Sequence, residues 1–272
     1  MNRCRLIDTG SLDCYSNMAI DEALLEAYGI EGSLPVLRIY GWKPAAFSIG
    51  YSQDPGNELN LNRCKNAGIS FVRRFTGGGV IFHKDELTYS IVCKREDLGI
   101  SAFSKEAYKV LCLFIIKAYK SLGLCAEYCL RETTRQDKSW FCFSERERYD
   151  ILINGKKLGG NAQRRRKDII FQHGSIPLKS HIEQAVPMLR GCPKIDRAKA
   201  TSLSHALGRD IGYKSLKDTL IKSFKQVFNS DILESSLSQR EISLARTLLN
   251  EKYIKKEWNL YRDACNVKAL VA

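Results

Sequence analysis

The chain has 272 residues, of which 44% are hydrophobic and 27% are charged, and this balance is typical of a folded globular protein and excludes a disordered one. The formal net charge of +13 predicts a positive surface that attracts acidic partners, either nucleic acids or acidic proteins. Charged residues, from Arg3 to Asp13, interrupt the apolar residues of the N-terminus, and no later stretch is apolar for long enough to span a membrane. We therefore expect no signal peptide and a cytoplasmic location, where thiols stay reduced.

The first predicted element is a helix that Ser16 or Asn17 caps, with Asp21 and Glu22 in its first turn and Gly29 as its end. Short β-rich segments follow, and Pro, Gly, Asn and Asp separate them, which predicts a sheet. These segments span residues 36–42, 47–51, 69–74, 80–82 and 88–94.

The second half of the chain begins with a predicted helix over 104–122 that Gly123 ends. Residues 131–148 are polar and charged around a small aromatic island, which predicts a loop, and loops on rigid scaffolds often carry function. Asn154-Gly155 is a strong hairpin signal and is followed by a further strand over 168–178. Beyond about residue 179 the apolar pattern becomes helical, with amphipathic segments at 215–228 and 238–253.

This order of elements predicts an α+β fold, with a mostly antiparallel sheet, helices packed against it and a small helical C-terminal region. The alternating strand–helix pattern of a doubly wound fold is missing. We expect a catalytic domain over residues 1–210 and a helical extension over 211–272.

The first candidate site is a glycine-rich segment that starts at Arg73-Arg74 and continues through Gly77-Gly78-Gly79 to His83. Consecutive glycines between strands let backbone N–H groups approach a ligand closely, and neighbouring arginines favour an anion or a carbonyl group there. The spacing matches neither of the nucleotide-binding glycine motifs. A glycine-rich turn without a ligand is an equally good interpretation of the spacing alone.

The second candidate site follows the predicted hairpin turn and contains Lys157, Gly159 and Asn161. Alternation along an extended strand places these three residues on one face. A lysine beside paired glycines can lie against a substrate, although a solvated hairpin lysine is the more common case.

The third candidate is Cys142 in the aromatic and charged loop. Positive charge from Arg146, Arg148 and Lys157 would favour its thiolate, the form that a nucleophile needs. Cysteines are more often small buried hydrophobes, and the ten in this chain follow neither a disulfide framework nor a zinc spacing, so we expect no metal site.

The basic run 164–167 is the last feature, and such runs are most often solvated turns. Here it is close in sequence to the second candidate site and, with Arg146 and Arg148, suggests a docking patch for an acidic carrier domain. Interleaved aromatic residues and nucleic-acid-binding motifs are missing, so we expect no nucleic-acid partner.

These motifs, in this order, resemble the lipoate branch of the biotin/lipoate protein ligase superfamily over roughly residues 1–210. The matching segments are N-M-A-I-D-E-A-L-L at 17–25, R-R-F-T-G-G-G-V-I-F-H at 73–83, E-L-T-Y-S at 86–90, G-K-K-L-G-G-N-A-Q at 155–163 and H-G-S-I-P-L at 173–178. Within that branch, Cys142-Phe143 followed by Tyr149-Asp150 resembles the cysteine loop of the octanoyltransferases that share the ligase scaffold.

The resemblance implies an octanoyltransferase that moves octanoyl from acyl carrier protein to a lysine of a lipoyl-domain acceptor protein, such as glycine cleavage H protein, in lipoate biosynthesis. It implies Cys142 as the acyl-thioester nucleophile and Lys157 as the residue that lowers its pKa, with no cofactor. The residues implied to bind the substrate are Arg74, Gly77, Gly78, His83, Gly159 and Asn161. An ATP-dependent lipoate–protein ligase and a non-catalytic module that binds acylated carriers are the alternatives, and they differ in whether Cys142 matters.

Overall fold

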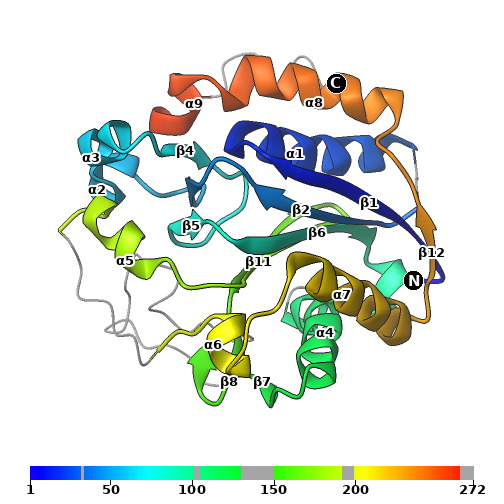
Figure 1. Ribbon diagram of the computed structural model, residues 1–272. Helices are drawn as coiled ribbons and strands as arrows, with labels where there is room; N and C mark the ends of the chain where they lie inside the picture. The colour runs from blue at the N-terminus through cyan, green and yellow to red at the C-terminus, as the bar shows by residue number, and fades with distance from the viewer. Residues whose placement is uncertain (32–33, 101–104, 130–149, 192–198, 264–272) are drawn as a thin grey trace.

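The computed structural model describes residues 1–31, 34–100, 105–129, 150–191 and 199–263. A six-stranded sheet in the order β10-β11-β6-β2-β1-β12 forms the centre, with helices on both faces (Figure 1). Its strands are β1 (Arg3–Leu12), β2 (Val36–Trp42), β6 (Glu86–Lys94), β10 (Gly160–Arg166), β11 (Ile169–Pro177) and β12 (Asp231–Glu234). Neighbours from β10 to β2 pair antiparallel, whereas β1 pairs parallel with both β2 and β12. The predicted α+β fold with a mostly antiparallel sheet is confirmed.

Two helical layers cover the sheet. On one face α1 (Cys14–Glu31) packs between the sheet and α8 (Gln239–Leu248), and on the other lie α4 (Lys105–Ser121) and α7 (Tyr213–Phe228) (Figure 1). Strand β2 shows the division, because Leu37 and Ile39 join the core under α4 and α7 while Val36 and Tyr40 join the core under α1. No helix in the described ranges is both long enough and apolar enough to span a membrane.

Smaller elements surround this sandwich. One three-stranded sheet contains β3 (Ala46–Ile49), β4 (Ser70–Arg73) and β5 (Ile81–His83), and another contains β7 (Ala126–Tyr128), β8 (Ile151–Ile153) and β9 (Lys156–Lys157). The short helices are α2 (Pro55–Glu58), α3 (Leu61–Asn66), η1 (Glu96–Leu98), α5 (Ile182–Ala185), η3 (Val186–Met188), α6 (Leu203–Leu207), η4 (Leu249–Tyr253) and α9 (Lys256–Tyr261).

The predicted boundaries of the first helix are wrong. Helix α1 begins at Cys14, because the Asp13 carboxylate accepts hydrogen bonds from the N–H groups of Tyr15 and Ser16, as an N-cap does. Asn17 lies inside the helix and is buried. The helix also continues past the predicted end at Gly29 as far as Glu31, since packing between the sheet and α8 outweighs the weak helix propensity of one glycine.

The later helices agree with the prediction. Helix α4 ends at Ser121, and Gly123 takes a left-handed conformation with φ +87°. Helix α8 starts with a capping box that Ser238 and Glu241 form. The hairpin is also confirmed, because β8 and β9 pair across Asn154 and Gly155, both of which have positive φ.

Strands β1 and β12 were not predicted, and both depend on long-range pairing. Charged residues interrupt the apolar pattern of β1, so the pattern does not predict a strand there. Strand β12 is an edge strand of four residues, and its pairing with β1 begins at Arg3. The chain beyond residue 210 thus adds a strand to the central sheet and a helix against α1. The domain boundary near residue 210 stays a prediction.

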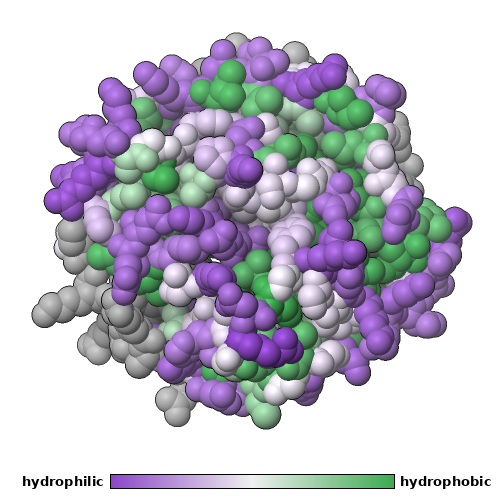
Figure 2. Space-filling view, in the orientation of Figure 1, coloured by the Kyte–Doolittle hydropathy of each residue, from purple (hydrophilic) through white to green (hydrophobic). Residues whose placement is uncertain are grey.

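Hydrophilic side chains cover most of the face shown in Figure 2, and apolar residues form separate patches between them.

Candidate active site

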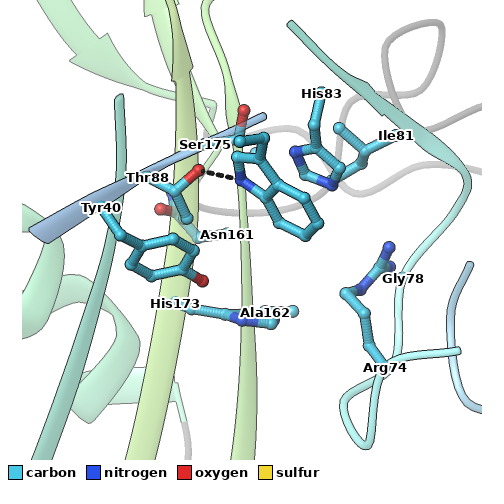
Figure 3. Close-up of a pocket in the computed structure, with 13 residues that line it drawn as sticks. Tyr40, Arg74, Gly78, Ile81, His83, Thr88, Asn161, Ala162, His173 and Ser175 are labelled. Atoms are coloured by element: carbon cyan, nitrogen blue, oxygen red, sulfur yellow. Dashed lines mark hydrogen bonds between the residues drawn. The ribbon is translucent and has the colours of Figure 1, made fainter. Parts of the chain in front are cut away.

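A pocket lies between the central sheet and the small sheet β4-β3-β5 (Figure 3). One wall follows from the sheet register, in which Tyr40, Thr88, Ser175 and Gly160 are consecutive partners across β2, β6, β11 and β10. Partners in adjacent strands project to the same face, and all four residues line the pocket. The antiparallel pairing therefore brings together residues that are up to 135 positions apart in the sequence.

The next row of the same face, two residues further along each strand, contains Arg38, Ser90, His173 and Ala162. His173 and Ala162 also line the pocket. In Figure 3 the labelled Tyr40 and His173 rings lie on the sheet side, opposite Arg74 and Ile81.

The opposite wall contains the glycine-rich segment, whose shape depends on Arg74. This buried side chain donates from Nη1 to Ser48 Oγ at 2.6 Å and from Nη2 to the carbonyl oxygens of Gly77 and Gly79 at 3.1 and 2.9 Å. Arg74 and Gly78 line the pocket, whereas Gly77 contributes to the wall through its contact with Arg74. The structure therefore brings the predicted residues Arg74, Gly77 and Gly78 together.

His83 lies at one end of this wall, where its ring stacks on Trp42 with centroids 3.7 Å apart. Its Nε2 is 2.6 Å from Ser48 Oγ and its Nδ1 is 2.7 Å from Glu86 Oε1. Two hydrogen bonds and one stacked ring fix the imidazole, so His83 presents a defined aromatic surface to the pocket.

Glu86 organises this end of the pocket although it does not line it. Its Oε1 accepts a hydrogen bond from Thr88 Oγ1 at 2.6 Å, and its Oε2 accepts one from Ser175 Oγ at 2.7 Å, in addition to the contact with His83. Thr88 Oγ1 in turn accepts the indole N–H of Trp42 (Figure 3, dashed line). A single buried carboxylate thus orients three pocket side chains directly and a fourth through Thr88.

Asp21 has a similar role on the sheet wall. This fully buried carboxylate interacts with Arg38 at 2.7 Å, Tyr40 Oη at 2.8 Å, Ser90 Oγ at 2.8 Å and His173 Nδ1 at 3.3 Å. Burial on its own would raise the pKa of Asp21, but the Arg38 charge and the contacts with His173 and Ser90 outweigh burial and hold the pKa below its ordinary value.

The pKa of His173 is also lowered, but here burial is the dominant cause. Burial lowers the pKa of His173 below 6.5, and the hydrogen bond with Asp21, which raises it, does not compensate. Its Nε2 is 2.7 Å from Thr76 Oγ1. The ring is therefore neutral near pH 7 and is held at both nitrogens.

Asn161 and Gly159 have different positions relative to the pocket. Asn161 lines it, and its Oδ1 accepts a hydrogen bond from Tyr89 Oη at 2.7 Å. Gly159 lies behind the wall with φ +80°, and a Cβ there would be 2.1 Å from the carbonyl oxygen of Ser175. Its contribution is close backbone packing against β11.

Lys157 lies outside the pocket, in strand β9. It is 2% exposed, and its Nζ is 2.7 Å from Asp150 Oδ2, so the solvated hairpin lysine is excluded. The predicted common face for Lys157, Gly159 and Asn161 is also wrong. Strand β9 ends at Lys157 in one sheet and β10 starts at Gly160 in another, and the positive φ of Gly159 breaks the alternation between them.

Cys142, together with Arg146 and Arg148, lies outside the described residues. Of the basic run, Arg164 and Arg166 are exposed on the edge strand β10, and Arg165 is partly buried. Within the described ranges no three His, Cys, Asp or Glu side chains are grouped closely enough to hold a metal ion.

Sequence patterns did not predict that Glu86, Asp21 and His173 are part of the site. Each lies in one of the motifs, but its role at the pocket was not predicted. Asp21 and Glu86 gave no distinctive signal, because each has an acidic neighbour in the sequence, Glu22 and Asp85, as exposed carboxylates often do. Tyr40 and Trp42 gave no signal beyond that of an ordinary buried strand.

Comparisons with known proteins agree with this geometry. Residues 13–225 match the family model described as the lipoyl protein ligase A/B catalytic domain. Proteins named octanoyltransferase LipM are similar to nearly the whole chain: the one from Brevibacillus brevis is 34% identical, covering 96% of this chain and 100% of the relative. The one from Symbiobacterium thermophilum is 36% identical, covering 94% of this chain and 97% of the relative.

Solved structures show the same scaffold. A lipoate–protein ligase A structure with bound ATP has a TM-score of 0.80 at 25% identity, covering 95% of this chain and 98% of that chain. A bipartite lipoate protein ligase from Thermoplasma acidophilum, described with its E2 lipoyl domain, has a TM-score of 0.77 at 25% identity, covering 95% of this chain and 96% of that chain. The chain therefore belongs to the lipoyl protein ligase A/B catalytic domain family, in the lipoate branch that its motifs resemble.

Proposed function

We propose that this protein is an octanoyltransferase that moves octanoyl from acyl carrier protein to a lysine of a lipoyl-domain protein in lipoate biosynthesis, in the cytoplasm. The observation that carries the proposal is the similarity along nearly the full length to proteins named octanoyltransferase LipM, at 34% and 36% identity. The pocket supports it, because aromatic rings and glycine backbone line a narrow space suited to an aliphatic chain.

In this proposal Cys142 is the nucleophile. The described chain resumes at Asp150, eight residues after Cys142, and Asp150 contacts Lys157. In this mechanism the ammonium group of Lys157 stabilises the thiolate. Because Asp150 balances the lysine charge, the stabilisation comes from a hydrogen-bond donor and not from net charge.

The substrate-binding residues divide into two groups. Arg74, Gly78, His83 and Asn161 contact the acyl chain, since they line the pocket. Gly77 and Gly159 shape the walls through Arg74 and β11 and do not contact the substrate.

The reaction is a double displacement. The Cys142 thiolate attacks the thioester carbonyl of the octanoyl carrier, N–H groups of the glycine-rich segment stabilise the oxyanion, and the carrier thiol leaves. The acceptor lysine, as a neutral amine, then attacks the new enzyme thioester, an amide forms, and the Cys142 thiol is released. Thioester exchange is nearly neutral in free energy and amide formation is downhill, so the reaction needs no ATP.

An ATP-dependent lipoate–protein ligase is the second candidate, and the similarity to a ligase structure with bound ATP favours it. The two functions differ in the acyl donor and in their dependence on Cys142. A module that only binds acylated carriers would leave the acceptor unmodified with either donor.

The test compares both donors on one lipoyl-domain acceptor and follows the acceptor by intact-mass spectrometry. We expect octanoyl transfer from octanoyl-carrier protein without ATP, and little product from free octanoate or lipoate with ATP and magnesium. The enzyme itself should gain one octanoyl mass that hydroxylamine removes, and Cys142→Ala should gain none. Cys125→Ala is the matched control, because Cys125 is exposed and should leave the acyl-enzyme intact.

Robust ATP-dependent lipoylation that survives Cys142→Ala would replace the transferase proposal with the ligase. Acylation of the acceptor by Cys142→Ala at the wild-type rate would contradict the covalent mechanism.

A further inference from the structure

The two adjacent arginines of the glycine-rich motif point to different parts of the molecule. Arg74 lines the pocket, whereas Arg73, the last residue of β4, is fully buried away from it. The Arg73 guanidinium donates to six backbone carbonyl oxygens in two segments that are far apart in the sequence. They are those of Gly50, Tyr51, Gln53, Trp258, Asn259 and Leu260, at 2.6 to 3.3 Å.

One of these segments supports the glycine-rich wall. Nη1 of Arg73 donates to the carbonyl oxygens of Tyr51 and Gln53 at 2.8 and 2.6 Å, and to that of Gly50 at 3.3 Å. Gly50 in turn touches the pocket wall directly, because a Cβ on Gly50 would lie 1.9 Å from the carbonyl oxygen of Gly78. Any displacement of the 50–53 turn is thus transmitted to a pocket residue through backbone contact.

The other segment is the carboxyl end of α9. Nε and Nη2 of Arg73 donate to the carbonyl oxygens of Trp258 and Asn259, both at 3.0 Å, where a cation also interacts favourably with the helix end. The backbone of Arg73 is held as well, because its N–H donates to Asn259 Oδ1 at 2.8 Å and its carbonyl accepts from Trp258 Nε1 at 3.0 Å. Helix α9 lies beside β4 in Figure 1.

Helix α9 is itself anchored to the body of the protein. Lys252 lies in η4, just before α9; it is buried and contacts both carboxylate oxygens of Glu22 in α1 at 2.7 Å. The same ammonium lies 3.9 Å from the centroid of the Trp258 ring. The C-terminal helix therefore has a fixed position, which it can impose on Arg73.

We propose that Arg73 is a positioning residue that fastens the carboxyl end of α9 to the 50–53 turn, so that the C-terminal helix sets the position of the glycine-rich wall of the acyl pocket. This proposal rests on the proposed octanoyl transfer, because it assigns the pocket to the acyl group. Under this proposal residues 258–260 support the pocket from outside, although all the residues that line the pocket come earlier in the chain, between Tyr40 and Ser175.

The test uses full-length Arg73→Met and Arg73→Lys variants. The first readout is the dissociation constant of the unreactive octyl thioether of pantetheine, measured by calorimetry. The second is KM and kcat for octanoyl-carrier protein. We expect Arg73→Met to weaken binding and raise KM by about tenfold or more, because a wall displaced by about 1 Å changes substrate placement strongly. Arg73→Lys should lie between wild type and Arg73→Met, since an ammonium reaches fewer of the carbonyls.

Arg5→Met is the matched control, because Arg5 also ties the C-terminal segment to the body but does so away from the pocket. Its guanidinium contacts Glu241 at 2.7 Å, Ser235 Oγ at 3.1 Å and the carbonyl oxygen of Ser236 at 2.9 Å. Arg5→Met should lower the melting temperature without changing the dissociation constant of the thioether. Trp258→Phe, which removes a single hydrogen bond to Arg73, provides a milder variant if Arg73→Met does not fold, and it should shift binding in the same direction.

These measurements test the positioning role of Arg73 and the proposed octanoyl transfer separately. A wild-type protein that neither binds the thioether nor forms an acyl-enzyme contradicts the proposed function, and the inference falls with it. An active wild type whose Arg73→Met and Trp258→Phe variants lose thermal stability but keep wild-type dissociation constants and KM values overturns the inference alone.

Discussion

Shared buried carboxylates hold the polar side chains of the pocket in place. Asp21 contacts the pocket residues Tyr40 and His173, together with Arg38 and Ser90 of the adjoining sheet. A second carboxylate, Glu86, orients side chains at the opposite end of the pocket. Such networks orient side chains well only while every member keeps its partner and its protonation state.

His173 gives this network a measurable pH dependence. Burial lowers its pKa below 6.5, so the unfolded chain binds a proton at a pH where the folded protein does not. The stability is therefore fully present above pH 6.5 and declines as the pH falls from 6.5 towards the lowered pKa, by at most about 1.4 kcal/mol per pH unit. Urea unfolding across this range should show the decline in wild type and a shallower one in His173→Gln. Identical slopes would show that another group is responsible.

The Asp150–Lys157 ion pair should contribute to stability as a buried pair does. The side chains are 4% and 3% exposed, so Asp150→Asn leaves the lysine charge buried without this carboxylate, and we expect a loss of about 3–5 kcal/mol in the free energy of unfolding. The double variant Asp150→Asn/Lys157→Met should be more stable than Asp150→Asn. Chemical denaturation measures all three.

An exposed pair provides the control for this prediction. Lys179 and Asp210 also approach to 2.8 Å, but their side chains are 53% and 72% exposed, so Asp210→Asn should change stability little. Equal losses from Asp150→Asn and Asp210→Asn would mean that burial does not determine the effect.

At the scale of elements, the turn from β9 to β10 connects two sheets, and Gly159 makes that turn possible. Gly159 and Gly155 both have positive φ, but a Cβ on Gly159 would lie 2.1 Å from the carbonyl oxygen of Ser175, whereas one on Gly155 would meet open space. Gly155→Ala should therefore cost only the left-handed conformation, about 1–2 kcal/mol.

Gly159→Ala adds a backbone clash to the same conformational cost, so we expect a larger loss of stability and a loss of octanoyl transfer, since Ser175 and Gly160 line the pocket. Denaturation midpoints and transfer rates of the two variants, measured side by side, test this. Equal behaviour of Gly155→Ala and Gly159→Ala would show that the β9–β10 junction can relax.

Over the whole molecule, the positive charge should act on the encounter with the acidic carrier protein. Alternation along β10 places Arg164 on the same face as the pocket residue Ala162 and two residues further along, about 7 Å away. Arg164→Glu should slow association with octanoyl-carrier protein, and the effect should shrink as salt rises, because exposed charges are screened.

Stopped-flow association rates at several salt concentrations measure this effect, with Lys120→Glu as a control of equal charge change on the exposed side of α4. A salt-independent loss, or an equal effect of the two reversals, would contradict docking at β10. Arg166 is less suitable for this test because it pairs with Glu26 of α1.

The sequence by itself determined the local elements and the family. Periodicity, Asn154-Gly155 and Gly123 act through neighbouring residues, so α4, α7, the β8–β9 hairpin and most strands follow from short-range signals. The glycine-rich motif could be recognised for the same reason, because its residues are consecutive.

Only the tertiary structure decided which of these residues meet. Strand β1 depends on β2 and β12, and the pocket depends on the register of four strands, which no local pattern contains. The two arginines show the physical reason most clearly. Arg73 and Arg74 are identical and adjacent in the sequence, yet alternation at the end of β4 directs one to helix α9 and the other to the pocket wall. Their different environments are created by segments that lie up to 187 residues away along the chain.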